Sequence, residues 1–311
     1  MEEVTLGAPF PPAMLPVITR NRAESPVMAA LLALVSAICY GVSDFSGGLG
    51  SRRAAATAVV LVSNAVSLLL AVLAVELLPG STYSGRDMLW GVAGGVVGLL
   101  GVVLLYRGLA IGPMSVVAPL TAVLSALVPL AAGVLAGERP GTIALIGVVL
   151  ALPAMLLIGR EPSRPAAAAL SRGALASALC AGLSFGGFFV LLAQTGPDGG
   201  AWPLVAQRAA SVALLLGISF VAALRQRGSV LLPGGRILGL AAVAGITDFA
   251  ANLAYVIATH HGLFAPVAVI SSLYPASTLL LARGVLGERL ARQQRAGLAL
   301  AAVAVALIAL H

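Results

Sequence analysis

Three polar side chains stand out because they interrupt long apolar stretches of this sequence: Arg208, Asp248 and Asn252. Placing an arginine or aspartate at the centre of a membrane helix costs about 2.5–3.5 kcal/mol on insertion scales. Such residues therefore mark ion or substrate paths by default. Asp248, Asn252 and Tyr255 follow one another at spacings of four and three, which places them on about one face of a helix. That stripe predicts either a lined path, a hydrogen-bond network between helices, or a protonatable site coupled to a proton gradient.

Arg208 lies about 9 Å along its predicted helix, at 1.5 Å per residue. It could bind an anionic substrate group, pair with a carboxylate across the bundle, or extend its long stem to the membrane surface. Because no partner is evident in the sequence, we lean toward substrates that bear a carboxylate or phosphate. Further candidate binding residues are Tyr40 and Asn64, and Asn64 could instead simply bridge two helices.

The segment Ser271-Ser272-Leu273-Tyr274-Pro275 is the most polar part of another apolar stretch. Proline removes a backbone hydrogen bond and frees a carbonyl group, which then needs a partner or a wet cavity. Carriers often hold substrate at such broken helices. We therefore predict that Ser271, Ser272 and Tyr274 contact substrate, and that Pro275, Pro119 and Pro129 are hinges or kinks. Kinking for packing alone is the alternative.

The remaining titratable residues have simpler interpretations. Asp44 is interpreted as a polar residue near a helix end, and His260 and His261 as interfacial residues or a titrating gate. Glu138 and Glu288 are interpreted as anchors. The sequence contains no His-Glu-x-x-His, no Walker loop and no Gly-x-Ser-x-Gly, so we predict no catalytic residues, no metal site and no cofactor.

The elements that must position these residues are membrane helices. Hydrophobic residues make up 60% of the 311 residues and charged residues only 9%, against roughly 25% charged in soluble domains. The net charge of +7 comes from arginine alone, and the arginines fall mainly in short breaks between apolar stretches. Contact with lipid headgroups explains them better than nucleic acid, which we exclude as a partner.

Crossing the hydrocarbon layer takes about 20 apolar residues. The breaks predict a flexible tail (1–26), a linker (160–172) and two repeats (27–159 and 173–311). Within the repeats we expect ten spans: 27–48, 55–77, 88–109, 114–135, 142–159, 173–194, 202–223, 236–258, 263–285 and 293–310.

The two repeats are suggested by two copies of Gly-Glu-Arg, at 137–139 and 287–289, and by an ungapped match of 112–139 with 262–289. Weaker echoes pair Tyr106 with Tyr255, Tyr40-Gly41 with Phe185-Gly186, and Ser63-Asn64 with Gln207-Arg208. Five spans per repeat is an odd number, so the second repeat must enter the membrane upside down. The predicted fold class is an all-α integral membrane protein of ten transmembrane helices in two inverted five-helix repeats.

Arginine counts predict the orientation. Twelve arginines fall after spans 1, 3, 5, 7 and 9, and only four fall on the other side: Arg20, Arg22, Arg86 and Arg139. By the positive-inside rule the first group faces the cytoplasm and both termini face out.

A proline-containing helix that ends in Gly-Glu, followed by a short turn and a last apolar helix, occurs twice. This pattern resembles the EamA-type permeases of the drug/metabolite transporter superfamily. The resemblance implies a ten-helix inverted-repeat carrier of the cell membrane, commonly an exporter of amino acids, other small metabolites or drugs. It also implies cytoplasmic termini, contrary to the arginine count, so the orientation stays open.

The predicted function is secondary transport by alternating access, with a small molecule and the lipid bilayer as partners. Coupled protons and the choice of monomer or homodimer are left open. A non-transporting membrane subunit or an integral-membrane lipid-modifying enzyme are the alternatives.

Overall fold

The described part of the chain is almost entirely helical, as its apolar stretches require. The computed structural model describes residues 25–77, 81–112, 114–159, 171–224, 234–287 and 289–310. The first half contains α1 (Pro26–Ser51), α2 (Ala56–Leu77), α3 (Gly85–Ile111), α4 (Met114–Leu135) and α5 (Thr142–Ile158). The second half contains α6 (Arg172–Leu192), α7 (Trp202–Leu224), α8 (Gly235–His261), α9 (Phe264–Ser271), α10 (Tyr274–Leu286) and α11 (Arg292–Ala309), with a 3₁₀ turn, η2, at Pro197–Gly199.

Eight segments within the described ranges are long and apolar enough to cross a membrane. The broken pair α9–α10 counts as one of them, and α5 is a shorter apolar helix. The first turn of α11 carries Arg292 and Arg295, and α11 is not among the eight. The helix ends agree with the predicted spans to within three residues, except that the span 263–285 is broken into α9 and α10. The predicted tail lies outside the described residues up to residue 24, as do residues 160–170 of the predicted linker and Glu288.

The two halves of the chain repeat the same packing. Glycine contacts that are close enough to exclude a larger residue recur in matched pairs: Gly41 with Thr278 and Gly186 with Val128, Gly95 with Gln207 and Gly245 with Ser63, Gly112 with Ala174 and Gly262 with Ala29, Gly147 with Leu307 and Gly297 with Leu157. Such approaches are typical of helices packed in lipid. Each contact made by a glycine of the first half is matched by a contact made by the equivalent glycine of the second half. The duplication seen in the sequence is therefore also present in the packing.

These contacts fix which residues of the two halves are equivalent. Gly41 of α1 answers Gly186 of α6, and Gly95 of α3 answers Gly245 of α8. Counting along α3 and α8 from that second pair shows that the predicted pairing of Tyr106 with Tyr255 is wrong by one position. Leu105 is equivalent to Tyr255. Tyr106 was paired with Tyr255 because it is the neighbouring tyrosine.

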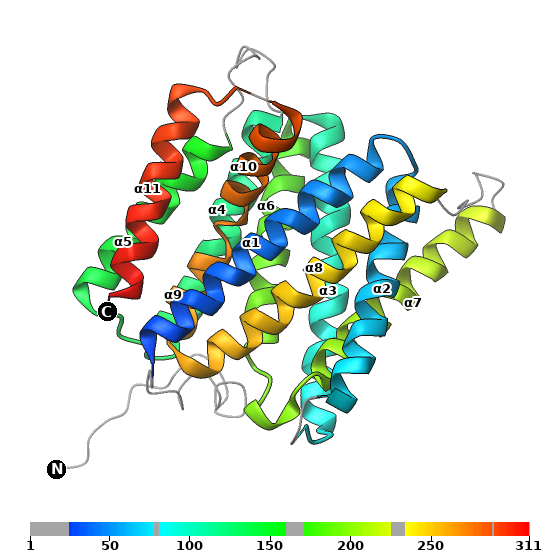
Figure 1. The fold of residues 1–311 in the computed structure, drawn as a ribbon, viewed down its shortest axis with the longest axis horizontal. Coiled ribbons are helices and arrows are strands. Elements are labelled where there is room, and N and C mark those ends of the chain that lie inside the picture. The colour runs from blue at the N-terminus through cyan, green and yellow to red at the C-terminus, as the bar shows by residue number, and fades with distance from the viewer. Residues whose placement is uncertain are drawn as a thin grey trace.

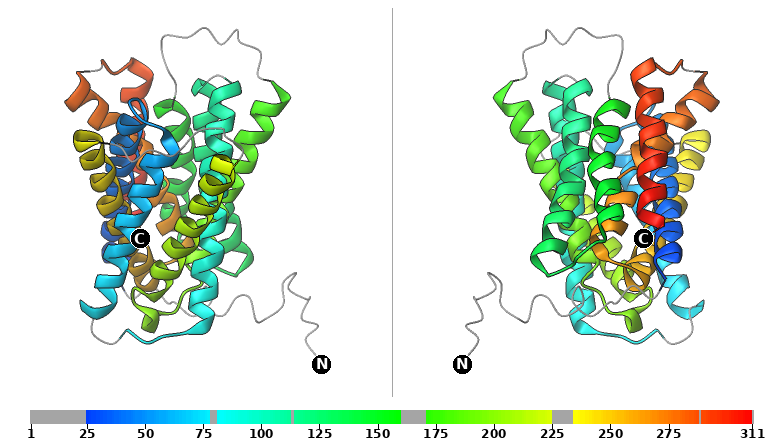
Figure 2. Two further views of the ribbon diagram at one scale, coloured as in Figure 1. Left: turned by 90° about the vertical axis from the view of Figure 1, so that its right-hand side faces the viewer. Right: turned by 90° about the vertical axis from the view of Figure 1, so that its left-hand side faces the viewer.

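The helices are arranged as two sets that diverge toward one end. In the first set α1 packs on α8 and α10, and in the second set α3 packs on α6 and α7; α5 pairs with α11 (Figure 1). We call the end where α5 finishes and α6 begins the linker end, and the opposite end, where α1 begins, the terminal end. Figure 2 shows α6 and α10 far apart at the linker end, whereas the helices converge toward the terminal end.

Candidate functional site

The predicted membrane arginine has a partner. Arg208 of α7 and Asp248 of α8 form an ion pair with 2.5 Å between Nη2 and Oδ2. Only 8% of Arg208 is exposed, and Asp248 lies at the midpoint of α8. Pairing offsets the cost of holding either charge at that depth, although desolvation cancels much of the gain. Of the three alternatives for Arg208, the structure supports pairing with a carboxylate across the bundle, which removes the reason for favouring anionic substrates.

Helix α2 holds the ion pair from one side. The Asn64 Oδ1 atom accepts a hydrogen bond from Arg208 Nη1 at 3.1 Å, and the Ser67 hydroxyl donates to Asp248 Oδ2 at 3.3 Å. Asn64 therefore bridges helices, as its alternative interpretation predicted. The sequence reasoning missed Ser67, although its position three residues after Asn64 on the same helix face was an available signal.

Asn252 joins the ion pair to a second group of polar side chains. Its Oδ1 accepts hydrogen bonds from the Tyr40 hydroxyl at 3.1 Å and from Gln207 Nε2 at 3.2 Å, and its Nδ2 donates to the Asp248 carbonyl at 2.7 Å. The Gln207 Oε1 atom is buried without a hydrogen-bond partner in the described chain. We call these residues the polar cluster: Tyr40, Asn64, Ser67, Gln207, Arg208, Asp248 and Asn252.

Several other predicted site residues lie outside the polar cluster. The Tyr255 hydroxyl donates to the Phe189 carbonyl at 2.9 Å. Ser271 and Ser272 are fully buried and donate to the backbone carbonyls of Ala33 and Ala268. These three side chains therefore satisfy backbone acceptors, and their role in substrate contact stays a prediction.

The predicted break in the ninth span is present, between α9 and α10. The Tyr274 ring at this break lies 6.2 Å from that of Tyr40, so Tyr274 borders the polar cluster. Pro275 stands in the first turn of α10, where its missing N–H costs little. Pro119 and Pro129 lie inside an uninterrupted α4, and their role as hinges stays a prediction.

Asp44 is not a helix-end residue. It lies seven residues before the end of α1, is exposed, and is close enough to Asp248 to interact electrostatically. It also interacts with the hydroxyl groups of Tyr274 and Tyr106. These neighbours belong to three other helices, so Asp44 faces the inside of the bundle.

The terminal end is tied together across the two sets of helices. His260 Nε2 lies 2.9 Å from the Thr195 carbonyl oxygen, which joins the ends of α8 and α6. Within the set of α3, α6 and α7, the Gly196 N–H after α6 donates to Asp87 Oδ1 at the start of α3 at 3.2 Å. At the linker end, the side-chain hydrogen bonds of the described residues join helices of the same set: Ser43 to Ala244, Thr278 to Gly41, and Ser171 to Ile111. Among the described residues, hydrogen bonds therefore join the two sets at the terminal end and not at the linker end.

Glu138 closes the terminal end at a third point. Its carboxylate accepts the backbone N–H groups of Phe264 at 2.6 Å and Ala265 at 2.9 Å, which are orphan donors at the start of α9. Burial raises the pKa of the Glu138 carboxyl, and the two N–H donors oppose that rise. The predicted anchor is therefore a helix cap that ties the loop after α4 to α9.

Removing this cap should destabilise the protein measurably. We expect Glu138→Ala to lower the free energy of unfolding by about 1–2 kcal/mol, the usual cost of losing a helix cap. Glu138→Gln should cost less because one acceptor oxygen remains. Thermal unfolding in detergent measures both, with Glu76→Ala, at an exposed position near the end of α2, as the matched control. Equal stability of Glu138→Ala and the control would contradict a capping role.

A family model described as "EamA-like transporter family" matches residues 27–160 and 172–310. The chain belongs to the EamA-like transporter family. No curated protein sequence matches it. A solved structure titled only "Crystal structure of protein" is similar, with a TM-score of 0.71 and 15% identity over 90% of this chain and 95% of that one. At that identity the likeness concerns the fold alone.

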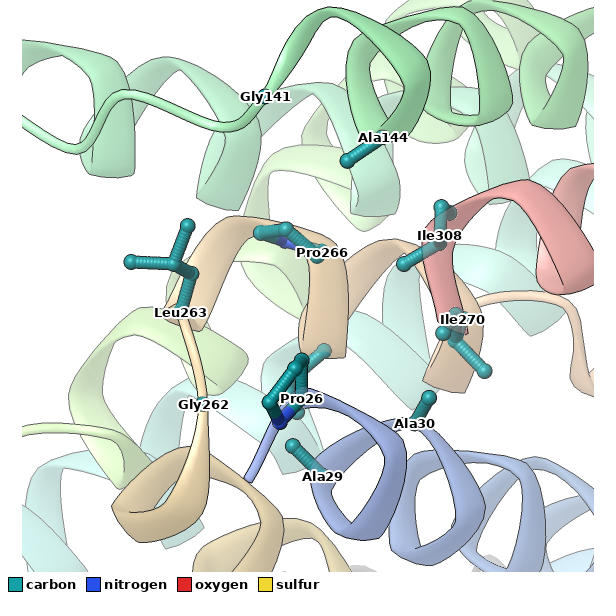
Figure 3. Close-up of a pocket in the computed structure, with 11 residues that line it drawn as sticks. Pro26, Ala29, Ala30, Gly141, Ala144, Gly262, Leu263, Pro266, Ile270 and Ile308 are labelled. Carbon is teal, nitrogen blue, oxygen red and sulfur yellow. The ribbon is translucent and has the colours of Figure 1, made fainter. Parts of the chain in front are cut away.

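The pocket in Figure 3 is not a substrate site of this EamA-like protein. It lies at the terminal end between α1, α5, α9 and α11, and its lining includes Pro26, Ala144, Pro266 and Ile308. It encloses about 40 Å³, whereas small-molecule pockets usually measure about 300–1,000 Å³. Its apolar walls and small size fit ordinary packing imperfection between helices.

Asn252 should be the residue that holds the polar cluster of this EamA-like protein together. We expect Asn252→Ala to cost about 1–3 kcal/mol, because the Tyr40 hydroxyl and Gln207 amide would lose their shared acceptor while buried. Thermal unfolding of the purified variant measures this. Thr247→Ala is the control, since the hydrogen bonds that the Thr247 hydroxyl makes with described residues stay within its own helix. A loss no greater than that of Thr247→Ala would show that water replaces the amide.

Proposed function

We propose that this EamA-like protein is a secondary transporter that moves small metabolites across the cell membrane by alternating access, and that it is not an enzyme. The ten helical spans, with α9 and α10 as one, would form two inverted five-helix repeats. Family membership supports the transporter class, and the apolar helices support the membrane.

The observation that carries the mechanism is the difference between the two ends of a repeated structure. The two halves are related by matched contacts, yet among the described residues the ion pair and hydrogen bonds that join the two helix sets lie from mid-depth to the terminal end, and none lies at the linker end. Because the two repeats are built alike, the first can adopt the packing that the second has now, and the second that of the first. The terminal end then opens as the linker end closes. The structure then represents the state that is open at the linker end.

Charge distribution supports a cytoplasmic linker end. The described arginines near helix ends divide unequally. Those at the terminal end are Arg86 and Arg139, whereas those at the linker end are Arg52, Arg53, Arg107, Arg172, Arg236, Arg283, Arg289, Arg292 and Arg295. By the positive-inside rule the state described would accept substrate from the cytoplasm, which favours export. We propose that the polar cluster, bordered by Tyr274, contacts the substrate.

Reconstitution into liposomes tests the transporter. Vesicles loaded with a mixture of amino acids, organic acids and amines should lose particular species only when the protein is present, and the loss should saturate with concentration. Flux equal to that of protein-free vesicles for every species would overturn the proposal. In whole cells, an impermeant maleimide should label Tyr83→Cys at the terminal end and spare Arg53→Cys until lysis; the reverse pattern would invert the direction.

A further inference from the structure

Within the part of the chain that the structure describes, Asp44 is the one carboxylate near the polar cluster without a neutralising positive group. It has no ion pair or hydrogen bond with the described residues, and the charge that acts on it is that of Asp248, which has the same sign. Arg208 is already paired with Asp248. The polar cluster is therefore neutral, and Asp44 adds one uncompensated negative charge beside it.

The groups around Asp44 offer no cation. Asp248 on α8, Tyr274 on α10 and Tyr106 on α3 lie close enough to interact electrostatically with Asp44, as does Tyr40 on its own helix. Arg107 follows Tyr106 directly and so points about 100° away around α3. On the other helices packed against α1, α9 has no titratable side chain and α2 has only Glu76, near the terminal end. Arg236 of α8 and the arginines of α10 and α11 lie near the linker-end termini of their helices, and the only charge found to act on Asp44 among the described residues is that of Asp248.

The repeat shows what happens to this position when an end closes. Asp44 follows Gly41 in α1 at the same spacing at which Phe189 follows the equivalent Gly186 in α6, so Phe189 is the equivalent of Asp44. Phe189 lies near the terminal end of α6 and is only 4% exposed. The centroid of its ring lies 4.8 Å from that of Tyr255 and 6.0 Å from that of Tyr40. The closed end therefore buries this position among aromatic side chains.

Closing the linker end by the same motion would bury Asp44 in apolar surroundings. The equivalents of Tyr40 and Tyr255 in the other half are Phe185 and Leu105, and neither can donate a side-chain hydrogen bond. The equivalent of Arg208 is Asn64, which is neutral. An ionised carboxylate without a partner is costly to bury in such a place, so closure is opposed as long as Asp44 carries its charge.

We propose that the linker end closes only after a positive charge, either a proton or the ammonium group of a substrate, has neutralised Asp44. This inference rests on the proposed alternating access and narrows the substrate class. An ammonium group at Asp44 would also lie near the rings of Tyr106 and Tyr274, whose faces attract cations. Transported molecules should then be amines or should move in exchange for protons, and an anion alone should not drive closure.

Distances across the linker end test this directly. Spin labels at Gly48→Cys and Ile111→Cys, in a Cys39→Ala/Cys180→Ala background, report the separation of α1 and α3; both positions are exposed. The protein in lipid nanodiscs is measured at about pH 8 and about pH 5, a range in which a carboxyl group can titrate. At the higher pH, methylammonium, benzylammonium, tetramethylammonium or benzoate is added.

We expect a short distance to grow in population when the pH falls or when an ammonium ion is added, and not with benzoate. Linkage to one proton changes the ratio of closed to open molecules up to about tenfold per pH unit. Closure at low pH alone identifies the proton as the neutralising charge, whereas closure by ammonium at pH 8 identifies the substrate. Either result supports the proposal.

Asp44→Asn separates this inference from the proposed function. It should populate the short distance without protons or amines, and the exposed Glu76→Gln should behave like the parent protein. If Asp44→Asn keeps the parent's dependence on pH and amines, or if the parent closes equally with benzoate, the role of Asp44 is overturned while alternating access stands. If no variant or condition shortens the distance although liposome flux is observed, alternating access by this motion fails as well.

Discussion

Replacing Arg208 with methionine is expected to destabilise the protein by about 3–5 kcal/mol, because it leaves the largely buried Asp248 carboxylate at the midpoint of α8 without its counter-charge. The reverse change, Asp248→Leu, should cost less. An arginine in the first turns of α7 can extend its stem toward the membrane surface, whereas a short aspartate cannot leave the centre of the bundle. Thermal unfolding of the purified variants measures both losses.

The double variant Arg208→Met/Asp248→Leu separates a structural role of the ion pair from a functional one. Buried ion pairs can often be replaced by apolar residues with little loss, so the double variant should recover most of the stability lost in Arg208→Met. If the ion pair serves transport, the double variant should show no flux across liposome membranes although it is stably folded. Parent-like flux would show that the pair only holds α2, α7 and α8 together. Additive losses of the two single changes would contradict a direct interaction.

The sequence predicted the helices and the two repeats well, because in a membrane the chemistry of the solvent leaves few choices. Backbone groups in lipid must be satisfied within a helix, so the apolar stretches had to be helices and the arginine-rich breaks had to be ends. The duplicated Gly-Glu-Arg marked two repeats. The break at Ser272-Leu273 was likewise predicted from Pro275. The hydroxyl groups of Ser271 and Ser272, however, donate to backbone carbonyls and not to the polar cluster.

The site was harder to predict, since its contacts join helices whose arrangement in space the sequence does not show. Asn64 and Arg208 belong to different halves of the chain, and helices that are apolar on every face give no signal of which face meets which. Arg208 therefore seemed to lack a partner although Asp248 was already named as a candidate. Asp44 was interpreted as a residue near a helix end from its position along the chain alone. Its neighbours come from α3, α8 and α10, and the sequence does not show how these helices lie around α1.

Cross-linking the terminal end is expected to stop transport. Thr195 and His260 lie in contact at the ends of α6 and α8, and the equivalent ends of α1 and α3 diverge in this structure (Figure 2). If the two ends alternate, α6 and α8 must part in every cycle. A short thiol-reactive cross-link between Thr195→Cys and His260→Cys, in the Cys39→Ala/Cys180→Ala background, should lower flux on the order of tenfold or more, since gating motions of this kind limit turnover.

The control joins helices that should not part. Ser171 and Ile111 are in contact at the linker ends of α6 and α3, which pack against each other extensively and so should move as one body. The same cross-linker applied to Ser171→Cys/Ile111→Cys should leave flux unchanged, and reduction with a thiol should restore flux only in the Thr195/His260 pair. Because the control pair also joins the ends of two long helices, loss of flux in both pairs would mean that the cross-linker itself harms the protein, whereas full flux in both would mean that α6 and α8 stay together throughout transport. Only a selective, reversible loss fits a terminal end that must open.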